Sequence, residues 1–176
     1  EFRAQVQCLG ESLGAEFSLR GLFGVDFLRV DDSIFLTEIN PRYTASVELL
    51  EFSMGQSLLH AHRKACLSFD ENPAGEFSVE PPERKRNQKL LGKAILFARR
   101  ELIVPDGDIN HSPIQQVDFT VPRLADIPDA GLQIREGEPI CTIFGEGDST
   151  ETCLGSLKTR ASELYSKFHR KNRPQS

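Results

Sequence analysis

The stretch GVDFLRVDDSIFLTEINPR, residues 24–42, decides how this chain folds. It contains two apolar runs, Gly24 to Val30 and Ile34 to Ile39, in which the side chains alternate as in β-strands. Between the runs lies Asp31-Asp32-Ser33, a composition that is typical of turns. The stretch therefore predicts a β-hairpin.

The length of the turn decides which side chains share a face of this hairpin. A two-residue loop would place Thr37 opposite Asp26 and send Glu38 to the other face, whereas a three-residue loop, Asp31 to Ser33, places Glu38 opposite Asp26. We choose the three-residue loop because it also pairs apolar residues. These pairs are Leu28 with Leu36 and Val30 with Ile34.

The opposed carboxylates predict a cation site. Two acids facing each other across a ladder repel, so one takes up a proton or a cation lies between them. Asn40 shares the face of Glu38, and carboxylate and amide oxygens are hard ligands that suit Mg²⁺ or Mn²⁺. Pro41 ends the strand, and Arg42 then offers a planar fork suited to phosphate. The plainer alternative is an edge hairpin with solvated acids and a surface arginine.

The same residues resemble the last catalytic strands of the ATP-grasp superfamily. Residues 24–27 and 36–42 are similar to its patterns G-x-[DE]-[FIV] and [LIF]-x-E-[IVM]-N-x-[RS]. The resemblance implies that Asp26, Glu38 and Asn40 hold one or two Mg²⁺ ions on the phosphates of ATP. It implies that Arg42 binds the transferred phosphoryl group or the acyl-phosphate as the catalytic arginine. Such enzymes phosphorylate a carboxylate and let an amine or similar nucleophile displace phosphate.

Differences between this sequence and known subfamily patterns indicate which ATP-grasp subfamilies it does not resemble. Biotin carboxylases continue with N-x-R-x-Q-V-E-H, but residues 40–47 lack the Gln, Glu and His, which argues against bicarbonate as substrate. D-alanine ligases usually carry Arg where this chain has Gly24. The chain looks closer to carboligase-like ATP-grasp proteins, and E-I-N-P-R also occurs in tyramine–glutamate ligases. The carboxylate and the nucleophile stay unspecified.

The segment before the hairpin is short. It predicts a helix from Phe2 to Leu13 that ends at Gly14, and a strand from Glu16 to Leu22. The phosphate-contacting lysines and the Gly-rich lid of an ATP-grasp enzyme precede its metal strands, and twenty-three residues do not encode them. We therefore expect a fragment of a longer enzyme, inactive by itself.

Beyond the hairpin, the chain predicts two helices, residues 47–54 ended by Gly55 and residues 56–67 with Leu58, Leu59 and Ala65 in the core. His60 and His62 are two positions apart on the second helix, so they cannot share a metal, and we expect packing or surface roles for them. Residues 1–70 form the predicted ATP-grasp lobe. Residues 71–87 read as a linker rich in proline and charge.

Residues 88–176 predict a small β-rich domain closed by a helix, which loosely resembles the C-terminal domain of biotin-carboxylase-like proteins. Gly145-Glu146-Gly147 reads as a turn, and Asp148 as the cap of the last helix. The predicted strands are 93–97, 101–104, 117–121, 132–135 and 139–144, the last two joined as a hairpin by Glu136-Gly137. The predicted apolar stripe of the helix is Leu154, Leu157, Ala161, Leu164 and Phe168.

Composition sets the remaining expectations. The 176 residues are 39% hydrophobic with a net charge of −5, so nothing favours a nucleic-acid partner, and no apolar run approaches the length of a membrane span. The four cysteines lack zinc spacing and are expected to be reduced, buried thiols of a cytoplasmic protein.

Together these readings predict an α+β fold, the C-terminal lobe of an ATP-grasp domain followed by the small β-rich domain. The predicted function is an ATP-dependent carboxylate ligase, of the carboxylate–amine kind, that uses Mg²⁺ or Mn²⁺. The alternative is a non-catalytic interaction module derived from an ATP-grasp domain. The oligomeric state is open.

Overall fold

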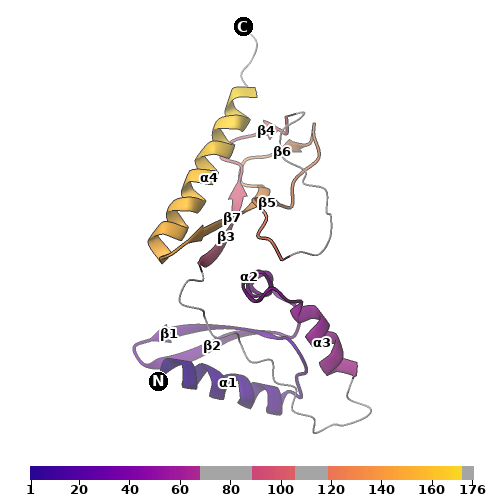
Figure 1. Cartoon of the computed structure of the whole chain (residues 1–176), viewed down its shortest axis with the longest axis vertical. Coiled ribbons are helices and arrows are strands. Elements are labelled where there is room, and N and C mark those ends of the chain that lie inside the picture. The colour runs from indigo at the N-terminus through magenta and orange to yellow at the C-terminus, as the bar shows by residue number, and fades with distance from the viewer. Residues whose placement is uncertain (68–88, 106–118, 172–176) are drawn as a thin grey trace. The chain divides into compact units, whose positions relative to one another are not determined.

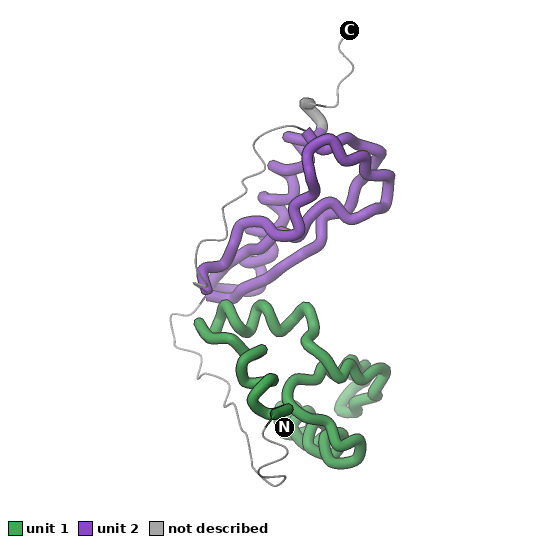
Figure 2. The backbone as a smooth tube through the Cα atoms, turned by 90° about the vertical axis from the view of Figure 1, so that its right-hand side faces the viewer, with its two compact units in different colours: residues 1–82 green, residues 83–176 purple. Residues whose placement is uncertain are grey.

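The computed structural model describes residues 1–67, 89–105 and 119–171. In these ranges the chain forms four helices and small antiparallel sheets, so the predicted α+β class is confirmed (Figure 1). The chain divides into two compact units, residues 1–82 and 83–176, drawn in green and purple in Figure 2. The predicted linker, residues 71–87, lies outside the described residues.

The first unit begins with a helix that lies along a hairpin. Helix α1 (Phe2–Glu16) runs beside strands β1 (Gly24–Val30) and β2 (Ser33–Asn40), which pair only with each other within the described residues (Figure 1). The ring of Phe2 lies 6.1 Å from that of Phe27, and the guanidinium of Arg29 lies over Phe2 at 4.6 Å. The hairpin face that carries Phe27 and Arg29 therefore packs on α1, and the opposite face does not.

Two predictions for this region are wrong. Helix α1 does not end at Gly14 but continues to Glu16, because the amide of Phe17 still donates to the carbonyl of Leu13, at 3.0 Å. No strand forms between residue 16 and Leu22. The amide of Leu22, which a strand would pair with a neighbouring strand, donates instead to a histidine ring of another helix.

That histidine is His62, and it holds the connection between α1 and β1. The amide of Leu22 donates to its Nδ1 at 3.0 Å. Gly21 has φ +67°, and a Cβ there would lie 2.4 Å from the same Nδ1, so only glycine fits. His62 thus has the packing role that the sequence predicted, and His60 is exposed.

Helices α2 (Ala45–Met54) and α3 (Leu58–Leu67) complete the first unit. Helix α2 ends at Gly55 in the left-handed conformation, φ 64°, as predicted. The Oε1 of Glu51 accepts hydrogen bonds from the first two amides of α3, those of Leu58 at 2.7 Å and Leu59 at 3.1 Å. Leu58 is buried as predicted, but the side chain of Leu59 is exposed, contrary to the prediction.

The second unit packs one long helix on a small sheet. Strands β3 (Leu90–Phe97), β7 (Pro139–Gly147) and β5 (Leu124–Ala125) form a sheet in the order β3-β7-β5, and α4 (Thr150–Lys171) lies along β3 and β7 (Figure 1). Strands β4 (Leu102–Ile103) and β6 (Gln133–Ile134) form a separate pair. The core includes Leu96, Val104, Ile134, Ile140, Ile143, Leu164 and Phe168.

The glycines of β7 explain one difference from the prediction. Gly145 and Gly147 lie within the strand, not in a turn, because α4 approaches them closely. A Cβ on Gly145 would lie 2.8 Å from Cγ of Leu157, and one on Gly147 would lie 2.3 Å from the amide nitrogen of Cys153. Glycine at these two positions therefore allows α4 to pack closely on β7.

Other predictions for this unit also need correction. The amide of Thr152 donates to Oγ of Ser149 at 3.3 Å, so Ser149 caps α4 in place of Asp148. Strands β6 and β7 lie on either side of a turn at Gly137 but belong to different sheets, so they form no hairpin. Residues 119–121 form no strand, and residues 117–118 lie outside the described ranges. The short strand β5 was not predicted. In the stripe of α4, Leu154 is exposed and Cys153 is buried.

Candidate functional site

The hairpin brings two acids face to face. Asp26 of β1 and Glu38 of β2 are direct Cα partners in the antiparallel ladder, as the sequence predicted. Gly24 and Asn40 form the pair two positions along, so Asn40 lies on the same face as the acids. Both carboxylates are exposed, whereas Asn40 is buried, with 9% of its surface accessible. The three predicted ligand side chains therefore share one face, the face that does not pack on α1.

The turn length and the register that produce this pairing differ from the prediction. The turn has two residues, Asp31 and Asp32, since Ser33 already pairs with Val30. The register shifts between Asp26 and Phe27, which leaves Thr37 as an extra residue in β2, a β-bulge. The predicted three-residue loop is therefore wrong. The predicted apolar pairs change accordingly: Leu28 pairs with Phe35 and Val30 with Ser33.

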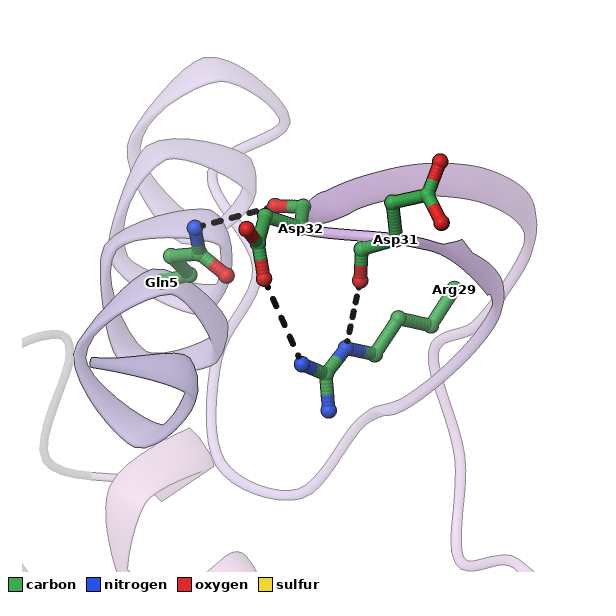
Figure 3. A network of polar contacts seen from close by, with 4 residues as sticks. All are labelled: Gln5, Arg29, Asp31 and Asp32. Carbon is green, nitrogen blue, oxygen red and sulfur yellow. Dashed lines mark hydrogen bonds and ion pairs between the residues drawn. The ribbon is translucent and has the colours of Figure 1, made fainter.

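Polar contacts fix the short turn and tie it to α1. Figure 3 shows the guanidinium of Arg29 between the two turn residues: its Nε donates to the carbonyl of Asp31 at 3.0 Å, and Nη2 lies 3.6 Å from Oδ1 of Asp32. The Nε2 of Gln5, on α1, donates to the carbonyl of Asp32 at 3.1 Å (Figure 3). Asp31 adopts φ 52°, a left-handed conformation that aspartate tolerates better than most residues. These contacts supply the physical reason for the two-residue turn, and the bulge then restores the pairing of the acids.

Asn40 joins an acid to a base. Its Nδ2 donates to Oδ2 of Asp26 at 3.3 Å, and its Oδ1 accepts from Nη2 of Arg42 at 3.2 Å. The Nη1 of Arg42 also donates to the carbonyl of Tyr43 at 3.3 Å. Asp26, Asn40 and Arg42 thus form a continuous chain of contacts, with Glu38 opposite its acidic end.

A tight turn and a glycine set the position of Arg42. The amide of Arg42 donates to the carbonyl of Asn40 at 2.8 Å, so the chain folds back around Pro41 and keeps Arg42 beside the strand it has left. Thr44, the residue before α2, packs on β1: a Cβ on Gly24 would lie 2.8 Å from Cγ2 of Thr44. The first turn of α2 therefore begins next to the site, and the close approach of Thr44 explains why glycine occupies position 24.

A hydrogen bond between Tyr43 and Glu51 holds the residue after Arg42 against helix α2. The hydroxyl of Tyr43 donates to Oε2 of Glu51 at 2.7 Å, while the other carboxylate oxygen caps α3. Burial and the hydrogen bond to Glu51 raise the pKa of the Tyr43 phenol well above its usual value. The residue that follows Arg42 is thereby fixed to α2, a contact that no sequence pattern predicted.

The donor set fits a divalent cation that keeps several of its own ligands. Two carboxylates and an amide are hard oxygen donors, and Mg²⁺ commonly binds one or two carboxylates while sharing phosphate oxygens and waters. Within residues 1–67, 89–105 and 119–171, no group of three or more His, Cys, Asp and Glu side chains could hold a metal. A cation held by two carboxylates and one amide would keep coordination positions for water or phosphate oxygens.

An exposed apolar region lies next to the acids. Leu28, Val30 and Phe35 are 62%, 56% and 55% exposed, and alternation along the strands places them on the face of Asp26. The outer face of the hairpin is thus charged at one end and apolar at the other.

The four cysteines differ in their exposure. Cys8 and Cys66 are exposed, so the expectation of four buried thiols is wrong for two of them, while Cys141 and Cys153 are buried and all four are free. Among the helices of the described ranges, none combines the length and hydropathy that a bilayer-spanning segment requires.

The segment that carries the candidate site matches a known protein family. Residues 2–46 match a family model described as ATP-grasp domain, and the match includes α1, the hairpin and all four predicted site residues. The resemblance to the ATP-grasp superfamily is therefore confirmed for this segment.

One curated relative covers most of the chain. A protein of Methanocaldococcus jannaschii, described as uncharacterized, is 28% identical over 158 residues, which are 90% of this chain and 34% of the relative. The chain thus spans about a third of that relative's length. No solved structure matches the chain significantly.

Proposed function

We propose that this chain supplies the metal-bearing strands of an ATP-dependent carboxylate ligase. The observation that carries the proposal is the pairing of Asp26 with Glu38, with Asn40 and Arg42 in contact beside them, inside the segment that matches the ATP-grasp domain. Three of the four polar positions of the family pattern share one face of the hairpin, and the fourth, Arg42, contacts Asn40 beside them.

Each residue then has a chemical role. Asp26, Glu38 and Asn40 would hold Mg²⁺ or Mn²⁺, which when bound neutralises charge on the phosphate oxygens of ATP. Arg42 carries five N–H donors in a rigid fork and would bind the phosphoryl group as it is transferred. The exposed position of Arg42, at the end of a strand, leaves the outer side of its guanidinium accessible to an anion.

The reaction that suits these roles is carboxylate activation. An oxygen of the substrate carboxylate attacks the γ-phosphorus of ATP and ADP leaves, which gives an acyl-phosphate. An amine or similar nucleophile then attacks the acyl carbon, phosphate leaves, and the nucleophile loses a proton. Positioning and charge stabilisation carry this chemistry, so no protein nucleophile is required. The carboxylate–amine assignment rests on the resemblance of residues 24–42 to such ligases.

Titration with Mn²⁺ tests the site. In a ¹⁵N-labelled chain, paramagnetic Mn²⁺ should broaden the amide signals of residues around Asp26, Glu38 and Asn40 at the lowest concentrations. Asp26→Asn and Glu38→Gln should each abolish the selective broadening. Asp31→Asn is the matched control, because it removes one carboxylate from the same hairpin about 17 Å along the strand and asparagine accepts the positive φ at that position.

The titration also separates the proposal from its rival. A non-catalytic interaction module predicts that no signal of the hairpin broadens before the exposed acids elsewhere on the chain. That result, or equal broadening in the parent chain and the Glu38→Gln variant, would reject the ligase assignment.

A further inference from the structure

The amide of Asn40 has its orientation dictated by its two neighbours. On one side is the carboxylate of Asp26, which only accepts hydrogen bonds, and on the other is the guanidinium of Arg42, which only donates. The amide can satisfy both only with Nδ2 toward Asp26 and Oδ1 toward Arg42, as the distances of 3.3 Å and 3.2 Å show. Because only 9% of the surface of Asn40 is accessible, water cannot readily replace either hydrogen-bond partner.

This orientation is the wrong one for a metal ligand. The group that faces the acids is an NH₂, which has no lone pair to offer a cation, while the oxygen that could ligate is held by Arg42. In the absence of a cation, the Nδ2–H of Asn40 therefore stabilises the carboxylate of Asp26 by a hydrogen bond. A cation between Asp26 and Glu38 removes the need for that donor and attracts the amide oxygen instead.

We propose that Asn40 is a positioning residue that couples cation binding to the release of Arg42. When a divalent cation binds at Asp26 and Glu38, the amide of Asn40 rotates by half a turn and presents Oδ1 to the cation. Its NH₂ group then faces the guanidinium, and two donors cannot hydrogen-bond each other, so Arg42 loses this partner. The Nη2 group that Asn40 held then becomes available to an anion, in addition to the outer side of the guanidinium that is already exposed. This inference rests on the proposed function.

The coupling works in both directions. A ligand that shifts a two-state element shifts it by its differential affinity for the two states, and the effect is reciprocal. An anion that draws Arg42 away from Asn40 also frees the amide oxygen for the cation. The chain of contacts thus favours joint binding of cation and phosphate over binding of either alone, which suits a site that receives a metal–nucleotide complex.

The side-chain signals of the full chain report this rotation directly. In a ¹⁵N-labelled sample titrated with MgCl₂, we expect the two Hδ2 signals of Asn40 and the Hε signal of Arg42 to shift together. Their shifts should follow the same Mg²⁺ dependence as the backbone amides of Asp26 and Glu38. A parallel titration with NaCl at matched ionic strength is the control and should move neither side chain.

The outcomes distinguish the two proposals. If Asp26 and Glu38 respond to Mg²⁺ while the side chains of Asn40 and Arg42 stay unchanged, the coupling is overturned and the metal site stands. If Asp26 and Glu38 do not respond at all, both proposals are overturned.

A variant adds a second test. Asn40→Asp places an oxygen on both sides of the residue, so no rotation is needed and Arg42 keeps its partner. The variant should bind Mg²⁺ at Asp26 and Glu38 without a shift of the Arg42 Hε signal. A shift as large as that of the parent chain would contradict the coupling. If the variant does not fold, the titration of the parent chain decides alone.

Discussion

Replacing Glu38 by glutamine should stabilise the hairpin in the absence of divalent cations. Glu38 and Asp26 are direct partners, and like charges in that position repel. Among the described residues, the carboxylate of Glu38 makes no hydrogen bond that the substitution would break, whereas Asp26 accepts one from Asn40. Glu38→Gln therefore removes the repulsion at nearly constant shape.

The size of the effect follows from the register. Directly opposed side chains have Cβ atoms about 5 Å apart, and two unit charges at about 5 Å in water interact by about 0.8 kcal/mol. Both acids are exposed, so the dielectric of water applies and salt lowers the value further. We expect a gain of roughly 0.8 kcal/mol in the free energy of unfolding at low ionic strength, and about half of it at physiological salt.

Urea denaturation followed by the amide signals of β1 and β2 measures this gain for the first unit alone. Unfolding of the whole chain need not be two-state, because the chain has two units. With saturating Mg²⁺ the order should invert, since only the chain that retains Glu38 gains stability from the bound cation.

Asp31→Asn provides the comparison, as it makes the same change of charge in the same hairpin. It should leave the stability within about 0.5 kcal/mol of the parent. If Glu38→Gln destabilised the cation-free hairpin, or matched Asp31→Asn in both conditions, the reasoning from opposed carboxylates would be refuted.

Four further predictions concern other parts of the two units. Glu51→Gln should destabilise the first unit by about 1 kcal/mol, because the charged acceptor that caps α3 is lost, which urea denaturation will show. Because folding raises the pKa of Tyr43, its contribution to stability is complete below pH 10 and is lost as the pH rises from there through the folded-state pKa. Absorbance at 295 nm should show the ionisation of Tyr43 nearer pH 10 in the Glu51→Gln variant than in the parent chain. Gly145→Ala should destabilise the second unit by about 1–3 kcal/mol, since its Cβ would lie 2.8 Å from a leucine of α4, whereas Gly155→Ala on the open side of α4 should stabilise it by up to about 1 kcal/mol. Burial raises the pKa of the Cys141 thiol to about 11, so mass spectrometry should find it unmodified after native treatment with iodoacetamide at pH 8 and alkylated in urea.

The sequence predicted the hairpin and the opposition of Asp26 and Glu38, because alternation along strands ties each side chain to a face. The sequence could not show that the additional unpaired residue is Thr37 in β2 rather than a third residue of the turn. Whether the unpaired position falls in the turn or within β2 depends on contacts from α1, such as the hydrogen bond of Gln5 to the turn, and no local pattern contains them. The pairing of Leu28 with Phe35 was missed for that reason.

Glycine was the other source of error. Gly14 looked like the end of a helix, yet it has open space around it and α1 passes through. Gly145 and Gly147 looked like a turn, but they lie in a strand against which a helix packs closely. Local propensity identifies glycine as a residue with freedom, whereas tertiary contacts determine whether that freedom serves a turn or close packing.

Eleven residues lie between Asp26 and Glu38, and this odd number has an evolutionary consequence. A hairpin that keeps the two acids opposed must leave an odd number of residues unpaired, here the two of the turn and one at Thr37. Related chains could lengthen the loop by one residue if they also lost the bulge, or insert two residues at its tip, and the acids would still meet. A single residue inserted within either strand, without a compensating bulge, would rotate one acid to the side of α1. Surveys of homologous hairpins should therefore find length changes at the turn or at bulges rather than within the paired segments.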